Sequence, residues 1–135
     1  MVTDPGPWKK DGHRLIMTPS CEVTPKSITP AFYRELDQEY GGFAGHSLIA
    51  VNDFEEDWST WEMHPKGDEV VCLISGEIDF VFSVSGQEEV HHVSEPGTMI
   101  VVPKGIWHTA RTKTKASLIF VTPGEGTLNA EKPGA

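Results

Sequence analysis

The hydrophobic pattern from Gly45 onward restricts the fold of this chain more than any other feature, because its period is two. The clearest example is the stretch 78–84, where apolar side chains occupy every second position: Ile78, Phe80, Phe82 and Val84. Such alternation is typical of a strand with one buried face. Turn-forming residues divide the rest of the sequence about every 8–18 residues: Ser75-Gly76, Ser85-Gly86, Pro96-Gly97, Pro103-Lys104-Gly105 and Pro123-Gly124. We therefore predict an all-β sandwich or closed barrel.

The first 28 residues follow a different pattern, because prolines recur along them: Pro5, Pro7, Pro19 and Pro25. A proline in a helix interior removes a hydrogen bond and clashes with the preceding turn, so no long helix fits here. We expect residues 1–28 to form an extended N-terminal arm that wraps or pairs, with short strands near Arg14–Thr18.

One short helix is predicted over residues 30–40. Thr29 is suited to the N-cap, and Pro30 to the first helical position, where a missing N–H is tolerated. Apolar residues then recur at helical spacing, and Gly41-Gly42 ends the helix. We predict one domain over residues 29–122, including this helix, and a flexible C-terminal tail over residues 123–135, which are rich in Gly, Pro, Glu and Lys.

The run Val70–Ile74 is apolar at every position and so departs from the alternation. A strand that is covered on both faces has this pattern. The second cover is expected to come from the predicted helix or from a second subunit. Since an uncovered apolar patch is a liability for a monomer, we predict a homodimer.

Composition excludes several classes of partner. With 11 Lys+Arg against 20 Asp+Glu, the chain of 135 residues has a formal net charge of -9. Nucleic acids and anionic lipids both require clustered positive charge, so neither is an expected partner. The longest apolar run has five residues, whereas a spanning helix needs about 18. Without an export signal, and with Cys21 and Cys72 in unrelated contexts, a cytoplasmic protein with reduced thiols is expected.

Four potential metal ligands lie where two turns could bring them together. Glu62 and His64 are two residues apart, so in a strand they project to the same face. Residues 65–68 are suited to a turn that would return Glu69 beside His64, and His108 follows a second turn at 103–105. Burying two carboxylates together without a partner costs several kcal/mol. A divalent cation is the partner that we expect.

Two segments resemble the motifs of the cupin family. Residues 61–76, Trp-Glu-Met-His-Pro-Lys-Gly-Asp-Glu-Val-Val-Cys-Leu-Ile-Ser-Gly, are similar to the first motif, G-x5-H-x-H-x3,4-E-x6-G. Residues 97–108, Gly-Thr-Met-Ile-Val-Val-Pro-Lys-Gly-Ile-Trp-His, are similar to the second, G-x5-P-x-G-x2-H-x3-N. The internal spacings agree in both segments. The resemblance covers about residues 56–112 and implies the cupin double-stranded β-helix, a jelly-roll barrel.

The resemblance also implies a metal site. The family's ligand positions fall on Glu62, where the motif has histidine, and on His64, Glu69 and His108. Thr112 stands where the second motif ends in asparagine. Nitrogen and oxygen donors of this kind suit iron, manganese, zinc, nickel or cobalt, and the identity of the ion stays open. In the simplest alternative, Glu62 is instead a solvated rim carboxylate or is paired with a basic residue such as Arg111.

Two functions are compatible with this resemblance. In the first, the protein is a metal-dependent enzyme, dioxygenase-like or isomerase-like, that acts on a small oxygen-rich organic molecule. Glu62 would then be either a ligand or the catalytic general base beside the ion. In the second, the protein is a non-catalytic small-molecule binding or sensing module that retains the cupin pocket. The departures at residues 62 and 112 favour the second function, and the sequence leaves both open.

Overall fold

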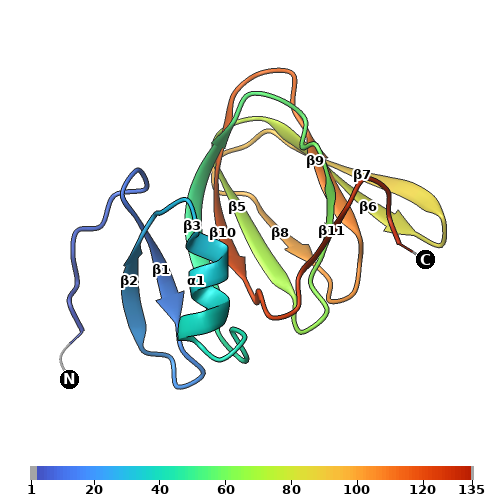
Figure 1. Cartoon of the computed structure of the whole chain (residues 1–135). Helices are drawn as coiled ribbons and strands as arrows, with labels where there is room; N and C mark the ends of the chain where they lie inside the picture. Colours follow the sequence, from blue (N-terminus) through green and yellow to red (C-terminus); the bar gives the residue numbers. More distant parts are fainter. Residues whose placement is uncertain (1–2, 135) are drawn as a thin grey trace.

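The structure is a computed structural model that describes residues 3–134. One sheet contains six strands: β1 (His13–Met17), β2 (Val23–Ser27), β3 (Ser47–Phe54), β5 (Glu69–Gly76), β8 (Met99–Val102) and β10 (Ala116–Thr122). The other contains five strands: β4 (Trp61–Met63), β6 (Ile78–Val84), β7 (Gln87–Val93), β9 (His108–Arg111) and β11 (Leu128–Ala130). Their spatial orders are β2-β1-β3-β10-β5-β8 and β11-β4-β9-β6-β7. The two sheets enclose a barrel (Figure 1), which confirms the predicted all-β jelly roll.

The interior between the sheets is filled by the alternating apolar side chains that the sequence pattern predicted. The buried cluster, hereafter the apolar end of the barrel, comprises Val71, Leu73, Ile78, Phe80, Phe82, Val93, Val102, Ala110, Ala116, Leu118 and Phe120. Burying one large apolar side chain contributes about 1.5–3 kcal/mol, so this cluster is the main source of stability of the barrel.

The N-terminal segment is part of the larger sheet. Strands β1 and β2 form an antiparallel hairpin, and β1 also pairs with β3, with Leu15 opposite Ile49. The expected short strands near 14–18 therefore lie at His13–Met17, and the pairing partner of the expected arm is β3. A second apolar cluster joins this hairpin to the helix; it comprises Ile16, Phe32, Leu36, Phe43 and Leu48.

The predicted helix is present as α1 (Phe32–Glu39), but it begins two residues later than expected. Its N-cap residue is Ala31, which makes no side-chain cap, whereas Thr29 uses its hydroxyl to contact Glu35. The N–H of Phe32 donates to the carbonyl of Thr29, so residues 29–31 form a turn before the helix. Figure 1 shows α1 beside β1, β2 and β3, at one side of the barrel.

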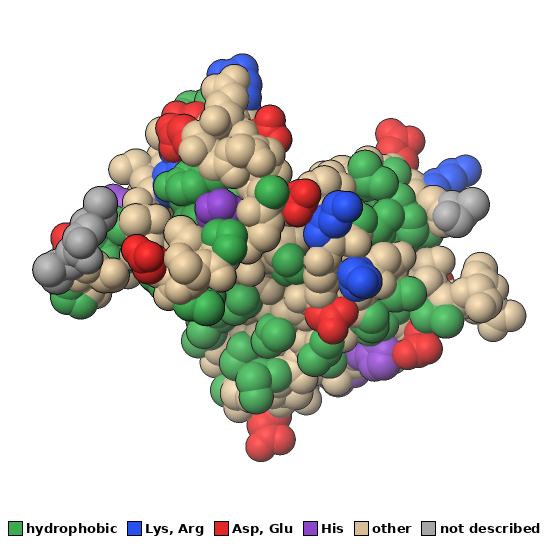
Figure 2. Space-filling model, turned by 90° about the horizontal axis from the view of Figure 1, so that it is seen from below, with side chains coloured by type: hydrophobic (Ala, Val, Ile, Leu, Met, Phe, Trp, Pro, Cys, Tyr) green, Lys and Arg blue, Asp and Glu red, His purple; other side chains and the backbone are tan. Residues whose placement is uncertain are grey.

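The apolar run on β5 is covered on one face only. Val71 and Leu73 point into the barrel and are buried, whereas Val70 and Ile74 are 37% and 43% exposed. On the neighbouring strand β8, the outward-facing Met99 and Val101 are also exposed. The helix packs elsewhere, against β1 and β3, so it does not supply the second cover. A second subunit as the cover stays a prediction. Hydrophobic side chains also reach the surface in the view of Figure 2.

The C-terminal segment differs from the flexible tail that we expected over 123–135. Residues 128–130 form β11, which pairs antiparallel with β4. Composition alone did not indicate this strand, because Gly, Pro, Glu and Lys dominate its surroundings and its partner strand lies far back in the chain. Among residues 3–134, no helix has the length and apolar character needed to cross a bilayer.

Candidate metal centre

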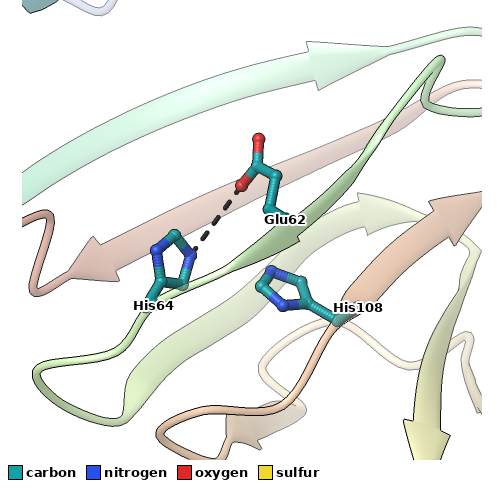
Figure 3. A group of neighbouring side chains, drawn as sticks. All are labelled: Glu62, His64 and His108. Carbon is teal, nitrogen blue, oxygen red and sulfur yellow. Dashed lines mark ion pairs between the residues drawn. The ribbon is translucent and has the colours of Figure 1, made fainter. Parts of the chain in front are cut away.

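The four predicted ligands lie at one end of the barrel interior, on strands of both sheets. Glu62 is on β4, His64 directly follows that strand, and His108 begins β9. These strands are neighbours, and Glu62 pairs opposite His108. Glu69 begins β5 in the other sheet. Figure 3 shows Glu62, His64 and His108 pointing toward one another from β4 and β9. We call this group of four residues the donor end of the barrel.

Two turns hold the donor end in place. The turn predicted at 103–105 is present, since the N–H of Ile106 donates to the carbonyl of Pro103. It is tied to the first motif twice. The N–H of Gly105 donates to the carbonyl of His64 at 3.0 Å, and the N–H of Lys104 donates to Asp68 Oδ1 at 2.7 Å. These bonds fix the two motif segments against each other.

The donor atoms are close enough to share one ion. Nε2 of His108 lies 3.4 Å from Oε1 of Glu69, and Nε2 of His64 lies 3.5 Å from Oε2 of Glu69. Oε2 of Glu62 lies 3.8 Å from Nε2 of His64. One donor atom from each of Glu62, His64 and His108 lies within 4.8 Å of the other two. Ligands about 2.0–2.2 Å from a metal ion are typically separated by about 3–3.5 Å. The contacts of Glu69 with the two histidines match this separation, whereas those of Glu62 are longer.

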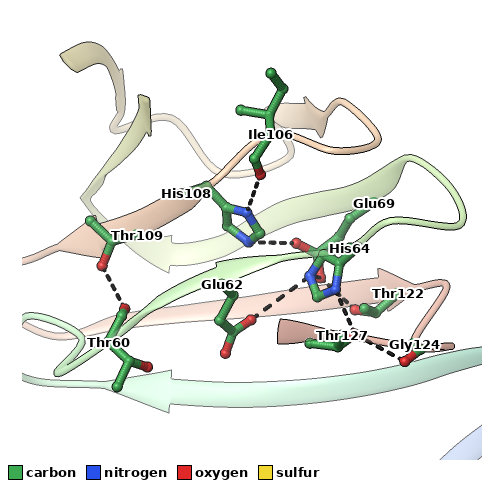
Figure 4. A network of polar contacts seen from close by, with 10 residues as sticks. All are labelled: Thr60, Glu62, His64, Glu69, Ile106, His108, Thr109, Thr122, Gly124 and Thr127. Carbon is green, nitrogen blue, oxygen red and sulfur yellow. Dashed lines mark hydrogen bonds and ion pairs between the residues drawn. The ribbon is translucent and has the colours of Figure 1, made fainter. Parts of the chain in front are cut away.

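Hydrogen bonds on the far side of each imidazole fix its tautomer. The hydroxyl of Thr127 donates to the carbonyl of Gly124, so it accepts a hydrogen bond from Nδ1 of His64 at 2.9 Å. Nδ1 of His108 donates to the carbonyl of Ile106 at 3.2 Å. When neutral, both rings therefore present the lone pair of Nε2 to the donor end, as metal-binding histidines do. Figure 4 shows this network.

Three buried atoms of the donor end have no hydrogen-bond partner among the described residues: Nε2 of His64, Nε2 of His108 and Oε1 of Glu69. The other carboxylate oxygen of Glu69 accepts a hydrogen bond from the hydroxyl of Thr122. Buried polar atoms are rarely left unpaired, since each costs about 1–3 kcal/mol. All three atoms carry lone pairs that can bind a proton or a metal ion. A single cation placed between them would therefore satisfy all three.

The carboxyl groups of the site differ in pKa. Burial opposes ionisation of Glu69, but the nearby imidazoles of His108 and His64 and the hydrogen bond from Thr122 outweigh it and lower the pKa of Glu69 to about 2. Burial raises the pKa of Glu62, which nearby His108 and His64 only partly offset. Burial alone would lower the pKa of His108, but the contact with Glu69 raises it. Glu69 is thus a permanent anion, and Glu62 is the carboxyl group that accepts a proton more readily.

The alternative in which Glu62 pairs with Arg111 is wrong. Arg111 forms a bidentate ion pair with Glu88 on the outside of β9, at 2.8 and 3.0 Å.

Thr112, which stands at the last position of the second motif, does not reach the donor end. Its hydroxyl contacts the carbonyls of Glu77 and Thr114 and so supports a turn.

A cavity of about 650 Å³ opens onto the donor end and contains residues that sequence reasoning missed. Trp58, Asn52 and Asn129 line it, together with the threonines that support the histidine and the glutamate. Asn52 had a signal in the sequence, since it is the polar member of the alternating inward positions of β3. Thr127 and Asn129 had none, because their contacts depend on the pairing of β11 with β4.

Comparisons with known proteins agree with this architecture. A family model described as Cupin matches residues 59–129, just over half of the chain. No curated protein matches. Among solved structures, oxalate oxidase is 22% identical with a TM-score of 0.51, over 61% of this chain and 45% of that chain. Recombinant oxalate oxidase in complex with glycolate is 21% identical, with the same TM-score and coverage.

A cupin-2 domain containing protein from Shewanella frigidimarina is 22% identical with a TM-score of 0.49, over 57% of this chain and 70% of that chain. In the match to oxalate oxidase, the present chain spans less than half the length of that chain. At these identities the structural likeness concerns the fold alone.

Proposed function

Because this chain belongs to the cupin family, we propose that it is a metal-dependent enzyme acting on a small, oxygen-rich organic molecule, in a dioxygenase-like or isomerase-like reaction. One observation carries this proposal. Three buried atoms, on His64, His108 and Glu69, have no hydrogen-bond partner among residues 3–134, and Glu69 lies 3.4–3.5 Å from both imidazoles. The similarity to oxalate oxidase supports the fold that holds such a site.

Each residue of the donor end has a distinct task in this proposal. His64, His108 and Glu69 would hold the ion, because their donor atoms are buried and their outer atoms are fixed by hydrogen bonds. A divalent cation bound there supplies Lewis acidity toward a substrate oxygen. Glu62 is 32% exposed, faces the cavity and has a raised pKa. It would therefore take a proton from a substrate hydroxyl or C–H group and return it later.

A non-catalytic binding or sensing module is the second candidate. It is favoured by Thr112, whose hydroxyl is used by backbone carbonyls and not by the cavity. Glutamate in place of the motif histidine at residue 62 also favours this candidate, since the motif's own ligand is lost there. The cavity and the donor end would then bind a ligand without transforming it.

Metal binding tests the proposal directly. The purified protein should contain close to one equivalent of a transition metal, and His64→Ala should reduce the affinity for Co(II) more than 100-fold by titration calorimetry. The control is His92→Ala, which removes a half-exposed imidazole on β7 and should leave the affinity unchanged. A chain that binds its ligand fully without metal would overturn the proposal.

Glu62→Gln separates the two functions. This substitution keeps the shape of the side chain but removes its basicity. For an enzyme, we expect the loaded variant to keep bound metal and ligand and to lose turnover by about 10²–10⁴-fold, the usual contribution of a general base. Unchanged ligand binding with no turnover in either protein would identify a sensing module.

A further inference from the structure

The cavity above the donor end has two kinds of wall. Aromatic and aliphatic side chains form one part: Leu48, Ala50, Phe54, Trp58 and Phe120. Hydroxyl and amide side chains form another: Asn52, Ser59, Thr60, Thr122, Thr127 and Asn129. A volume of about 650 Å³ falls within the usual range of small-molecule sites, so the space exceeds what a two-carbon ligand fills.

The charged carboxylates that line this cavity are not balanced by basic side chains among the described lining residues. Its lining includes three carboxylates, those of Asp37, Glu62 and Glu69, and neither Lys nor Arg occurs among the described residues that line it. Three basic side chains outside the cavity are held in ion pairs: Lys10 with Asp53, Lys26 with Glu35 and Glu39, and Arg111 with Glu88. The net charge of -9 adds a repulsive field for anions.

Charge balance then restricts the ligand. The two carboxylates of Glu62 and Glu69 neutralise a divalent cation. A ligand that brings a carboxylate of its own would add negative charge to a buried site whose proposed divalent cation is already neutralised and whose described lining contains neither Lys nor Arg, which is unfavourable. A ligand with only hydroxyl and carbonyl oxygens adds none overall, because a proton lost from a chelating hydroxyl can move to Glu62.

Two neutral carboxamides flank the donor end. Asn52 is on β3 opposite Leu118, whose side chain is buried in the barrel, so Asn52 also faces inward. Asn129 is on β11 directly opposite Glu62 on β4. Each carboxamide offers one acceptor and two donors without a charge, which suits hydroxyl and carbonyl groups.

From these observations we infer that the site selects neutral oxygen chelators with an apolar or aromatic body, such as hydroxyketones or vicinal diols of aromatic type, and discriminates against carboxylate-bearing ones. This inference rests on the proposed metal centre. The apolar wall takes the body of the ligand, and the two carboxamides orient its polar groups.

A series of probes that share one chelating unit tests the inference. Catechol, 3,4-dihydroxybenzoate and 3,4-dihydroxybenzylamine differ in charge but present the same two hydroxyls. We expect titration of the Co(II)-loaded protein, followed by its visible absorption and by calorimetry without oxygen, to give at least tenfold weaker binding of the benzoate than of catechol. The amine should bind at least as well as catechol. Equal binding of the benzoate and catechol would overturn the inference.

A pair of variants locates the source of the discrimination. Asn52→Lys places a cation inside the cavity and should improve binding of the benzoate about tenfold relative to catechol. Gln87→Lys adds the same charge at an exposed position on β7 and should leave the ratio unchanged. If Gln87→Lys restores benzoate binding equally, net charge and not the cavity is responsible, and the inference fails.

The failure of the metal centre is distinguishable from the failure of the inference. Co(II) affinity is measured first, without any organic probe, and its independence of His64 and His108 would refute the proposed function. If Co(II) binds at those histidines and the three probes bind alike, the metal centre stands and the ligand class is wrong.

Discussion

The two ends of the barrel interior lie on the same strands but follow opposite physical rules. On the inner face of β5, Glu69 is followed two positions later by Val71 and then by Leu73; on β9, His108 is followed by Ala110. The side chains of the apolar end pack against one another and need no further partner. The donor end leaves three buried atoms unpaired. One step along a strand thus separates side chains that stabilise the fold by packing from the proposed metal ligands.

The magnitudes show why both ends can coexist. Three unpaired buried polar groups cost about 3–9 kcal/mol in total. One large apolar side chain contributes about 1.5–3 kcal/mol on burial, and the apolar end contains several of them. The comparison therefore predicts that changes at the apolar end alter stability, whereas changes at the donor end alter binding.

The largest effect is expected for Phe80→Ala at the apolar end. Phe80 is fully buried, and removal of its ring should lower the free energy of unfolding by about 3–5 kcal/mol, measured with urea. The folded fraction should still bind one metal ion. Val90→Ala, at a residue that is 54% exposed, should change stability by less than about 0.5 kcal/mol. Loss of metal binding by folded Phe80→Ala protein would show that the ends are not separable.

Metal loading should have the next largest effect. At 100 times its dissociation constant, a divalent cation should raise the free energy of unfolding by about 2.7 kcal/mol, because it binds only the folded donor end. Calorimetric unfolding with and without a chelator measures this difference. His64→Ala should unfold at the same temperature under both conditions, and an equal stabilisation of that variant would place the ion elsewhere.

A smaller effect is expected from Thr127→Val. The substitution keeps the shape of the side chain but removes the acceptor that fixes Nδ1 of His64. Metal affinity should fall about 10–100-fold, as it does when outer partners of metal-binding histidines are lost. Titration calorimetry measures the change. Thr127→Ser retains the hydroxyl and should restore most of the affinity; equal losses in both variants would indicate a packing defect instead.

The smallest effect on either end is expected from Val101→Glu on the outer face of β8. Val101 is 55% exposed beside Val70, so the substitution should leave unfolding and metal binding of the protomer nearly unchanged. If this face joins two copies, as the run Val70–Ile74 led us to predict, light scattering should detect a dimer for the original chain and a monomer for the variant. A monomeric original chain would refute that prediction.

The parts that the sequence predicted well are those encoded locally. Glu62, His64 and Glu69 lie within one strand–turn–strand unit, and strand periodicity alone places the first two on one face. The helix was found from its apolar spacing, although its first turn was misplaced because Thr29 contacts Glu35 instead of capping.

The parts that were missed depend on contacts between distant residues. Thr127 supports His64 across 63 positions, and no local pattern marks a strand at residues 128–130. The run Val70–Ile74 was expected to be covered on both faces by the helix or a second subunit; the helix does not cover it, because α1 packs against β1 and β3, and cover by a second subunit stays a prediction. The hydrophobicity of a side chain indicates that it can be buried. It does not indicate which element of the fold will cover it.

The pairing of β11 with β4 has a consequence for the biosynthesis of the protein. The residue that orients His64 and one wall of the cavity emerge from the ribosome after every other strand. A nascent chain halted before residue 127 already contains every residue of the apolar end, but it lacks the hydroxyl that orients the imidazole of His64. Tight binding of the proposed metal ion is therefore expected only after β11 has paired with β4.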